Sequence, residues 1–450
     1  MKKHKRSTFS GKLGFVLSAA GASVGLGNIW RFPYLAAKYG GGIFLLVYII
    51  LALTFGYTLI MAETSLGRMT RKSPVGAFES FGNSRFISIG GWINAIIPIL
   101  IVPYYSVIGG WVIKYLIEYF AGHSKTLAGD AYFTTFISNG WSTEICFIIF
   151  TLFTLGIIYA GVRNGIERVS KFMMPILIVL SLIIAVYSVT RPGAIEGVKY
   201  FLVPNFDHFS WMTVVSAMGQ MFYSLSIAMG ILITFGSYMK KDTSIEKSTE
   251  NVEIFDTAIA IMAGLMIIPA VFAFSGGNAE TLKSGPALMF ITIPKVFANM
   301  GFGTAIGVVF FLLVLFAAVT SSIALTESAV STFEDELHWS RKKSTVFMGM
   351  VMLLLGTLSC LGYGPLANFK ILGMQFLDFF DFITNSVMIA TCLLVSKVVG
   401  VDKIEEEIKK DGQAFRRKKI FCFMIKYLCP LFAAIILISS VANAFGIITM

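Results

Sequence analysis

The chain has 450 residues, of which 56% are hydrophobic and 14% are charged, and its mean hydropathy is +0.78. Soluble domains usually carry roughly 25% charged residues, because a wet surface needs them. The composition therefore excludes a soluble enzyme, a secreted module and a disordered protein. We expect a protein that crosses a membrane several times.

Uncharged apolar stretches recur eleven times, and a membrane-spanning helix needs roughly 20 apolar residues. Because backbone exposed to lipid has to satisfy its own hydrogen bonds, and no segments of about ten alternating residues occur, we predict an all-α polytopic membrane protein. The stretches cover 13–30, 41–62, 86–113, 145–162, 172–190, 209–239, 257–279, 296–326, 344–369, 382–396 and 427–450.

The net charge of +11 is distributed in a way that indicates topology rather than nucleic-acid binding. With the N-terminus in the cytoplasm, 26 of the 36 Lys and Arg residues fall in the inner connections and only seven in the outer ones. Positive residues stay on the cytoplasmic side of membrane proteins. The sequence thus predicts a multi-pass protein of the cell (inner) membrane without a cleavable signal peptide, with a cytoplasmic N-terminus and an extracytoplasmic C-terminus.

Catalytic and metal-binding patterns do not occur. The five cysteines form no CxxC pair, the four histidines lie outside the apolar stretches, and neither HExxH nor GxSxG is found. The chain is therefore not expected to be an enzyme.

Two apolar stretches contain glycine and small polar residues at their centres, over 21–28 and 220–230. Glycine disfavours a continuous helix, and a helix broken inside a membrane is tolerated where its free backbone groups bind something. Matching breaks in two halves point to a transporter's binding site, although such glycines also allow close helix packing. We predict one domain (1–450) with five-helix repeats at 11–200 and 208–400 and an eleventh helix at 419–446.

Five motifs carry a family resemblance across the whole chain. They are Gly25-Leu26-Gly27-Asn28-Ile29-Trp30-Arg31-Phe32-Pro33-Tyr34, Tyr104-Tyr105, 219–230, 317–322 and 334–337. The chain resembles the neurotransmitter:sodium symporter family, and among its members the bacterial eleven-span amino-acid transporters. The resemblance implies a leucine-transporter-like fold, a 5+5 inverted repeat with broken helices 1 and 6.

The same resemblance implies a site for a zwitterionic amino acid. The N–H groups of Leu26 and Gly27 and the Tyr105 hydroxyl would bind the carboxylate. The expected substrate-binding residues are Ser23, Leu26, Gly27, Ile101, Tyr105, Tyr223, Ser224, Ser226, Met229, Ser321 and Leu325. Because much of this set is apolar, a charged substrate side chain would lose its hydration without gaining a partner. We expect a large hydrophobic or aromatic L-amino acid, with tyrosine a leading candidate.

Two sodium sites are implied as well, both built from the oxygen ligands that a hard cation prefers. The first would use Ser23, Asn28, Ser224, Asp256 and the substrate carboxylate. The second would use Gly21, Val24, Ala317, Thr320 and Ser321. In chloride-dependent members of the family an asparagine stands where this chain has Asp256, so transport is expected not to need chloride.

Charged residues inside the membrane are candidate functional groups. Arg31 is expected to pair with Asp381 as an outer gate, with Asp378 as the alternative partner. Arg6 is expected to pair with Asp335 as an inner gate. The neighbouring rings would be Tyr105 and Tyr223 outside, and Phe9 and Tyr238 inside.

These expectations amount to sodium-coupled symport by alternating access, with an amino-acid-binding sensor or a channel on the same scaffold as the alternative. Glu63 is expected to support the broken backbone of span six. The partners would be a small-molecule amino acid, sodium ions and membrane lipid, with no nucleic acid; the oligomeric state stays open.

Overall fold

The computed structural model describes residues 6–82, 84–276, 285–385 and 394–444. Within these ranges every regular element is a helix, and strand-like pairing is limited to isolated bridges such as Gly41 with Pro204. Eight helices are long and apolar enough to cross a membrane, and a bent pair adds a ninth. The predicted all-α membrane class is confirmed.

The first half of the chain contains spans one to five. Its elements are α1 (Lys12–Ser23), η1 (Gly27–Arg31), α2 (Phe32–Lys38), α3 (Gly42–Leu51), η2 (Ala52–Gly56), α4 (Tyr57–Thr70), α5 (Pro74–Glu79), α6 (Arg85–Phe120), α7 (Ser124–Leu127), α8 (Tyr132–Ser138), α9 (Gly140–Tyr159), η3 (Val162–Glu167) and α10 (Arg168–Val189). The elements η1, η2 and η3 are π-helical turns: η1 and η2 lie within spans one and two, and η3 begins span five.

The second half contains the remaining spans and a short apolar helix, Leu288–Ala298, between spans seven and eight. Its elements are α11 (Ala194–Leu202), η4 (Phe206–His208), α12 (Trp211–Ser224), α13 (Ile231–Tyr238), α14 (Ile245–Ser275), η6 (Leu288–Thr292), α15 (Ile293–Ala298), α16 (Gly303–Glu336), α17 (Arg341–Leu361), α18 (Phe376–Asn385), η7 (Val395–Val399), α20 (Val401–Lys409), η8 (Lys410–Gly412), α21 (Lys418–Phe423), η9 (Met424–Leu428) and α22 (Cys429–Ala444).

Several predicted boundaries shift in the structure. The stretch 296–326 covers two elements, because α15 ends at Ala298 and span eight, α16, begins only at Gly303. The stretch 344–369 is too long, since α17 ends at Leu361. Residues 277–279, 386–393 and 445–450, parts of predicted spans seven, ten and eleven, lie outside the described residues. The repeat boundaries 11–200 and 208–400 stay predictions.

The first predicted helix break is present. The two halves of span one, 12–23 and 27–38, are bent by 53°. Two glycines make room for neighbouring side chains at this bend. A Cβ on Gly25 would lie 2.7 Å from the Ser321 hydroxyl, and one on Gly27 would lie 2.4 Å from the Tyr223 ring. The Gly-x-Gly motif therefore keeps the backbone within reach of the side chains around the break.

The second predicted break separates α12 from α13 in span six. Three of the residues between these helices have left-handed backbone, with φ of 52° at Ser226, 59° at Ala228 and 68° at Gly230. Non-glycine residues in that region cost roughly 1–3 kcal/mol each, so the surroundings have to hold them. Glu63 of α4 does so, because its Oε1 accepts a 2.7 Å hydrogen bond from the Ala228 N–H.

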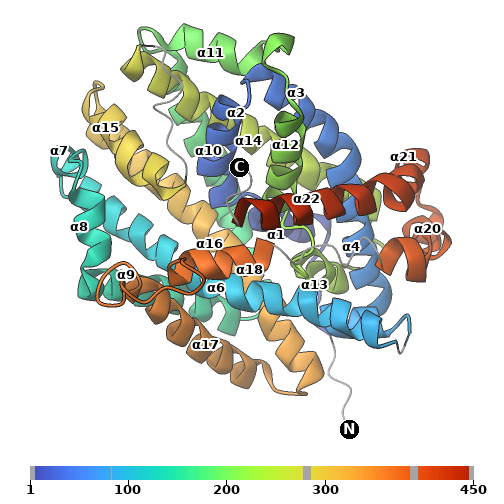
Figure 1. The fold of residues 1–450 in the computed structure, drawn as a ribbon. Helices are drawn as coiled ribbons and strands as arrows, with labels where there is room; N and C mark the ends of the chain where they lie inside the picture. The colour runs from blue at the N-terminus through green and yellow to red at the C-terminus, as the bar shows by residue number, and fades with distance from the viewer. Residues whose placement is uncertain (1–5, 83, 277–284, 386–393, 445–450) are drawn as a thin grey trace.

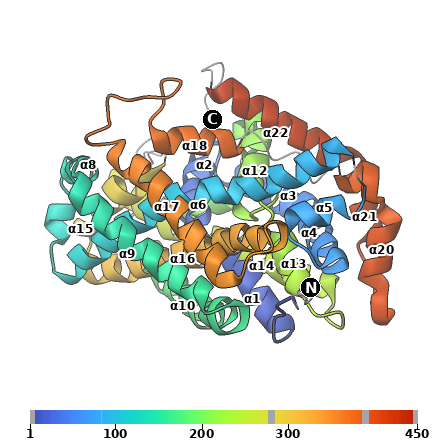
Figure 2. The same cartoon turned by 90° about the horizontal axis from the view of Figure 1, so that it is seen from below.

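Helix pairs pack closely around these breaks. A Cβ on Gly67 of α4 would lie 1.9 Å from the Ile233 carbonyl, and one on Gly236 of α13 would lie 2.4 Å from the Thr64 carbonyl. The two backbones therefore touch directly. α6 and α16 cross in the middle of the molecule, whereas α20, α21 and α22 lie at its periphery (Figures 1 and 2). The core that holds the site lies between the broken helices and these two long helices.

Candidate functional site

A small cavity lies at the two breaks. Its lining consists of Ala22, Ser23, Gly25, Leu26, Gly27, Asn28, Ile101, Tyr105, Tyr223, Ser226, Met229, Ser321 and Leu325. Ten of the eleven expected substrate-binding residues are in this set. Ser224 does not line the cavity.

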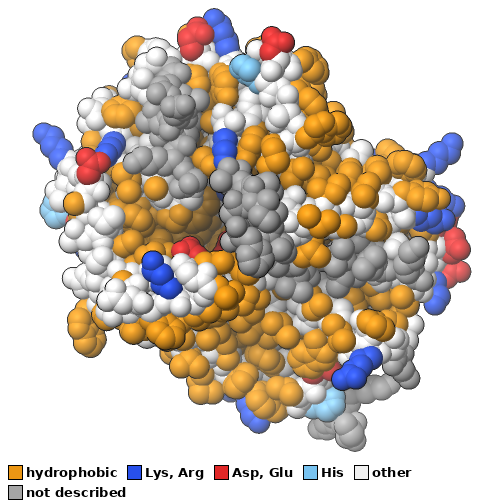
Figure 3. Space-filling model, viewed as in Figure 1, with side chains coloured by type: hydrophobic (Ala, Val, Ile, Leu, Met, Phe, Trp, Pro, Cys, Tyr) orange, Lys and Arg blue, Asp and Glu red, His pale blue; other side chains and the backbone are white. Residues whose placement is uncertain are grey.

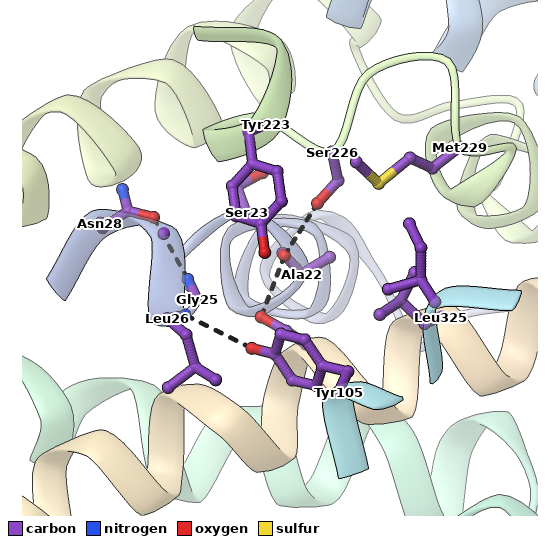
Figure 4. A pocket seen from close by; sticks show the side chains of 13 residues that line it. Ala22, Ser23, Gly25, Leu26, Asn28, Tyr105, Tyr223, Ser226, Met229 and Leu325 are labelled. Atoms are coloured by element: carbon purple, nitrogen blue, oxygen red, sulfur yellow. Dashed lines mark hydrogen bonds between the residues drawn. The ribbon is translucent and has the colours of Figure 1, made fainter. Parts of the chain in front are cut away.

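One end of the cavity presents polar groups from the bend in span one. The Leu26 N–H donates to the Tyr105 hydroxyl of α6 at 3.3 Å, and the Gly25 N–H donates to Asn28 Oδ1 at 3.3 Å (Figure 4). Backbone N–H groups at the start of a half-helix, with the helix dipole behind them, favour an anion. This end of the cavity is thus suited to a carboxylate.

The other end of the cavity is mainly apolar. Met229 and Leu325 lie together on the side away from Leu26 (Figure 4), and the lining also includes Ile101. Two serine hydroxyls also line the cavity, and both already donate to the backbone of α1. The Ser321 hydroxyl lies close to the bend, since a Cβ on Gly25 would be 2.7 Å from it. Ser226 donates to the Ala22 carbonyl at 3.0 Å, and Ser321 donates to the same carbonyl at 3.2 Å. Their oxygens keep capacity to accept a hydrogen bond.

Behind the polar end, four side chains form a buried network that includes three residues expected at the first sodium site. Asn28 Nδ2 donates to Ser224 Oγ and to Asp256 Oδ1, each at 2.8 Å, and Ser224 donates to the same carboxylate at 2.8 Å. The Tyr48 hydroxyl of α3 donates to Asp256 Oδ2 at 3.1 Å. The carboxylate, hydroxyl and amide oxygens match the preference of sodium, with the Asn28 amide turned to offer Oδ1.

Tyr48 was missed in the sequence, because a tyrosine inside the apolar run 41–62 carries no polar pattern that marks it. A second omission is Gln220 of α12, whose Nε2 donates to the Gly27 carbonyl at 3.1 Å. A buried amide directly before the break in span six was the available signal. Gln220 contributes to the site by holding the bend of span one against span six.

The expected second sodium site joins α1 to α16. Ser321 donates to the Gly21 carbonyl at 3.3 Å, and Thr320 donates to the Ala317 carbonyl at 3.2 Å. A Cβ on Gly21 would lie 3.1 Å from the Thr320 Cβ, so the helices are in close contact here. Val24 caps α1 with non-helical backbone, which leaves its carbonyl outside the helix ladder. The Gly21 and Ala317 carbonyls thus lie beside the Ser321 and Thr320 hydroxyls, and oxygen ligands of this kind also suit sodium.

The expected inner ion pair is formed. Arg6 NH1 lies 2.7 Å and 2.8 Å from the two Asp335 oxygens, and its Nε donates to Ser237 at 3.0 Å. The guanidinium also lies 4.9 Å from the centroid of the Tyr238 ring. Phe9 is fully buried next to this pair and meets the Tyr238 ring edge-on. The chain is therefore closed on the side of its N-terminus.

The expected outer pair is not formed in this structure. The Arg31 guanidinium lies 5.2 Å from the centroid of the Tyr223 ring, and Asp381 accepts a 3.0 Å hydrogen bond from Tyr104. Among the ion pairs of the described residues, none joins Arg31 to Asp381 or to Asp378. Instead of contacting each other, Asp381 bonds to the Tyr104 hydroxyl and Arg31 lies over the Tyr223 ring.

Comparison with known proteins adds to this geometry. The model of the "Sodium:neurotransmitter symporter family" matches residues 6–150 and 133–447. The uncharacterized sodium-dependent transporter YhdH of Bacillus subtilis is 32% identical over 460 residues, which cover 100% of both chains. The sodium-dependent dopamine transporter of Bos taurus is 26% identical, over 97% of this chain and 69% of its own.

A solved structure is similar over almost the whole chain. MhsT in complex with L-phenylalanine is 33% identical, with a TM-score of 0.86 over 97% of this chain and 100% of its own. The similarity covers both broken helices and the cavity between them.

Proposed function

Because the chain belongs to the sodium:neurotransmitter symporter family, we propose that it carries a large hydrophobic or aromatic L-amino acid into the cell together with sodium. It is a multi-pass membrane transporter that depends on sodium, and it is not an enzyme. We further propose that two sodium ions accompany the substrate, that chloride is not needed and that the N-terminus lies in the cytoplasm. The observation that carries it is the cavity at the two helix breaks, polar at one end and apolar at the other.

The substrate class follows from the two ends of this cavity. The Leu26 N–H and the Tyr105 hydroxyl would hold the substrate carboxylate, and the free carbonyls of the breaks would hold its ammonium. An acidic or basic side chain at the end lined by Met229 and Leu325 would be desolvated without a partner. Methionine is unbranched and adapts to a ring. The complex of MhsT with L-phenylalanine supports an aromatic substrate.

Tyrosine is the leading candidate because two serine hydroxyls line the cavity. Ser226 and Ser321 each donate to the backbone of α1, so each could accept the phenol proton. The remaining polar atom of the substrate would then not be left unpaired in the cavity. The same contact is missing for phenylalanine, and we expect tyrosine to bind more tightly.

Two sodium ions would accompany the substrate. The substrate carboxylate would complete the first site beside Asn28, Ser224 and Asp256, which links ion binding to substrate binding directly. Two cations and a zwitterion bring two positive charges into a site of low dielectric, where unbalanced charge is costly. The fixed carboxylate of Asp256 compensates one of them, and transport should therefore proceed without chloride.

Alternating access requires gates that open in turn. In this structure the Arg6–Asp335 pair is formed, whereas Arg31 and Asp381 are apart. With the N-terminus in the cytoplasm, as the distribution of Lys and Arg indicates, this arrangement would be closed to the cytoplasm. The Arg6–Asp335 pair is partly exposed, with 16% and 28% of the side chains accessible, so breaking it has a moderate cost.

Uptake into proteoliposomes tests the proposal. The purified chain should accumulate labelled L-tyrosine when sodium is higher outside, with equal rates in chloride and gluconate. Unlabelled Phe, Trp and Leu should compete, and glycine and glutamate should not. Uptake that is indifferent to the sodium gradient would support a channel, and binding without uptake would support a sensor. Competition by glutamate alone would refute the substrate class.

A further inference from the structure

The eleventh span is the least buried of the spans described. In the helix Lys418–Ser439, only 28% of the most apolar segment is buried, compared with 39–78% in the other unbroken spans. In Figure 1 its helix α22 runs across the front of the molecule, and in Figure 2, turned by 90°, α22 lies along the outer edge. One long face of this helix is therefore covered by something other than this chain.

The exposed face is an apolar stripe. Its members recur at helical spacing and are Ile420 (41% exposed), Phe423 (55%), Tyr427 (65%), Leu431 (52%) and Ile438 (68%). The rings of Phe423 and Tyr427 lie 5.7 Å apart. Aromatic side chains at the end of a span are typical of the zone where the headgroups begin.

Two lysines run along the edge of this stripe. Lys419 and Lys426 are both exposed and are seven residues apart, which places them about two turns, or roughly 10 Å, apart along the helix axis. Among the described residues neither of them has an acidic partner. The adjacent Lys418 differs, because it pairs with Glu405 at 2.7 Å. Long lysine stems lie along apolar surface and carry their charge toward the headgroups.

We propose that Lys419, Lys426 and the apolar stripe form a binding site for an anionic phospholipid. The two ammonium groups would hold the headgroup phosphate, and the acyl chains would lie on Phe423, Tyr427 and Leu431. Basic side chains, with acidic ones among them, lie at the same edge of the molecule over α20 and α21, whereas hydrophobic side chains cover much of the adjoining face (Figure 3). The positive charges and the apolar surface thus lie next to each other, as do the headgroup and the acyl chains of a phospholipid.

A second copy of the chain fits this face less well. A two-fold interface places the same patch on both partners. Lys419 and Lys426 would then meet their own counterparts, and like charges facing each other across an interface are unfavourable. An anionic lipid supplies the opposite charge, and each lysine near the membrane surface strengthens its binding.

Lipid titration of the full chain in detergent tests the proposal. Native mass spectrometry should show phosphatidylglycerol bound about 30-fold more tightly than phosphatidylcholine, which corresponds to about 2 kcal/mol. The variant Lys419→Gln/Lys426→Gln keeps the stems and removes both charges, and it should lose most of that preference. Lys426→Arg should keep it.

A matched control removes two other exposed lysines at the N-terminal end of a span. Lys342 and Lys343 lie 5.6 Å and 3.9 Å from the ring centroids of Tyr159 and Trp339. Lys342→Gln/Lys343→Gln should leave the preference for phosphatidylglycerol intact. Sodium-dependent amino-acid binding should persist in every variant and report correct folding. An unchanged lipid preference in Lys419→Gln/Lys426→Gln, or a dimer that this variant alone dissociates, would overturn the proposal.

Discussion

Arg6→Ala should open the chain on its N-terminal side without unfolding it. The arginine makes a two-oxygen contact with Asp335 and lies against the Tyr238 ring. A partly exposed ion pair contributes about 1 kcal/mol, and a cation–π contact about 0.5–1 kcal/mol. The variant should therefore favour the open state by about 1.5–2 kcal/mol, which is roughly a 10- to 30-fold change in population.

The charge of Arg6 is secure at the pH of such an experiment. Burial lowers its pKa, but Tyr238, Asp335 and Glu327 together outweigh burial and raise the pKa above its ordinary value. The contact is thus lost by the substitution and not by titration. Arg6→Lys keeps the charge but loses the fork-shaped contact with two oxygens, and its effect should be intermediate.

Amide hydrogen exchange in nanodiscs measures this change, since exchange in α1 (Lys12–Ser23) reports local opening. Exchange should accelerate about 10- to 30-fold in Arg6→Ala. Asp335→Ala should do more, because that carboxylate also accepts a 2.6 Å hydrogen bond from the Ser73 N–H. Arg191→Ala, on a distant connection, is the control. Unchanged exchange in Arg6→Ala, or equal acceleration in Arg191→Ala, would refute the assignment of the pair as a gate.

Three further substitutions test the site itself. Tyr105→Phe removes the hydroxyl beside the Leu26 N–H and should weaken substrate binding about 5- to 20-fold in competition assays, since a hydrogen bond to a charged group contributes about 1.5 kcal/mol. Asp256→Asn removes the one carboxylate that the protein contributes to the proposed first sodium site, so the sodium concentration for half-maximal uptake should rise, whereas sodium dependence that stays unaltered would exclude the residue. Glu63→Gln weakens the acceptor of the Ala228 N–H and should lower the melting temperature, whereas the exposed Glu196→Gln should not.

Composition and spacing were sufficient to predict the fold class, and glycine at two positions was sufficient to predict the breaks. The end of α15 and the start of α16 were not predictable, because apolar residues continue through both elements. The π-helical turns were not predictable either. A π-turn inserts one residue into a helix, and apolar runs such as 41–62 contain no residue pattern that distinguishes it.

The site was predictable to the extent that local motifs carry it. The two glycines of the Gly-x-Gly bend indicate that neighbouring side chains need space there. The structure identifies these neighbours as the Ser321 hydroxyl and the Tyr223 ring. Tyr48 is a residue of the site that local motifs could not identify. It meets Asp256 across 208 positions of sequence, through packing that no local pattern records. Sequence motifs therefore identify backbone ligands better than side chains contributed by distant helices.

The contrast between the two ion pairs follows from what surrounds each charge. Arg6 also donates to Ser237, and Asp335 also accepts from the Ser73 N–H, but neither bond replaces the contact between the two charged groups. Arg31 and Asp381 have alternatives in the Tyr223 ring and the Tyr104 hydroxyl. Tyr223 also lines the cavity, so a substrate that contacts its ring would change what Arg31 can lie against. We therefore propose that binding in the cavity releases Arg31 toward Asp381, which would couple occupancy to closure of the outer side.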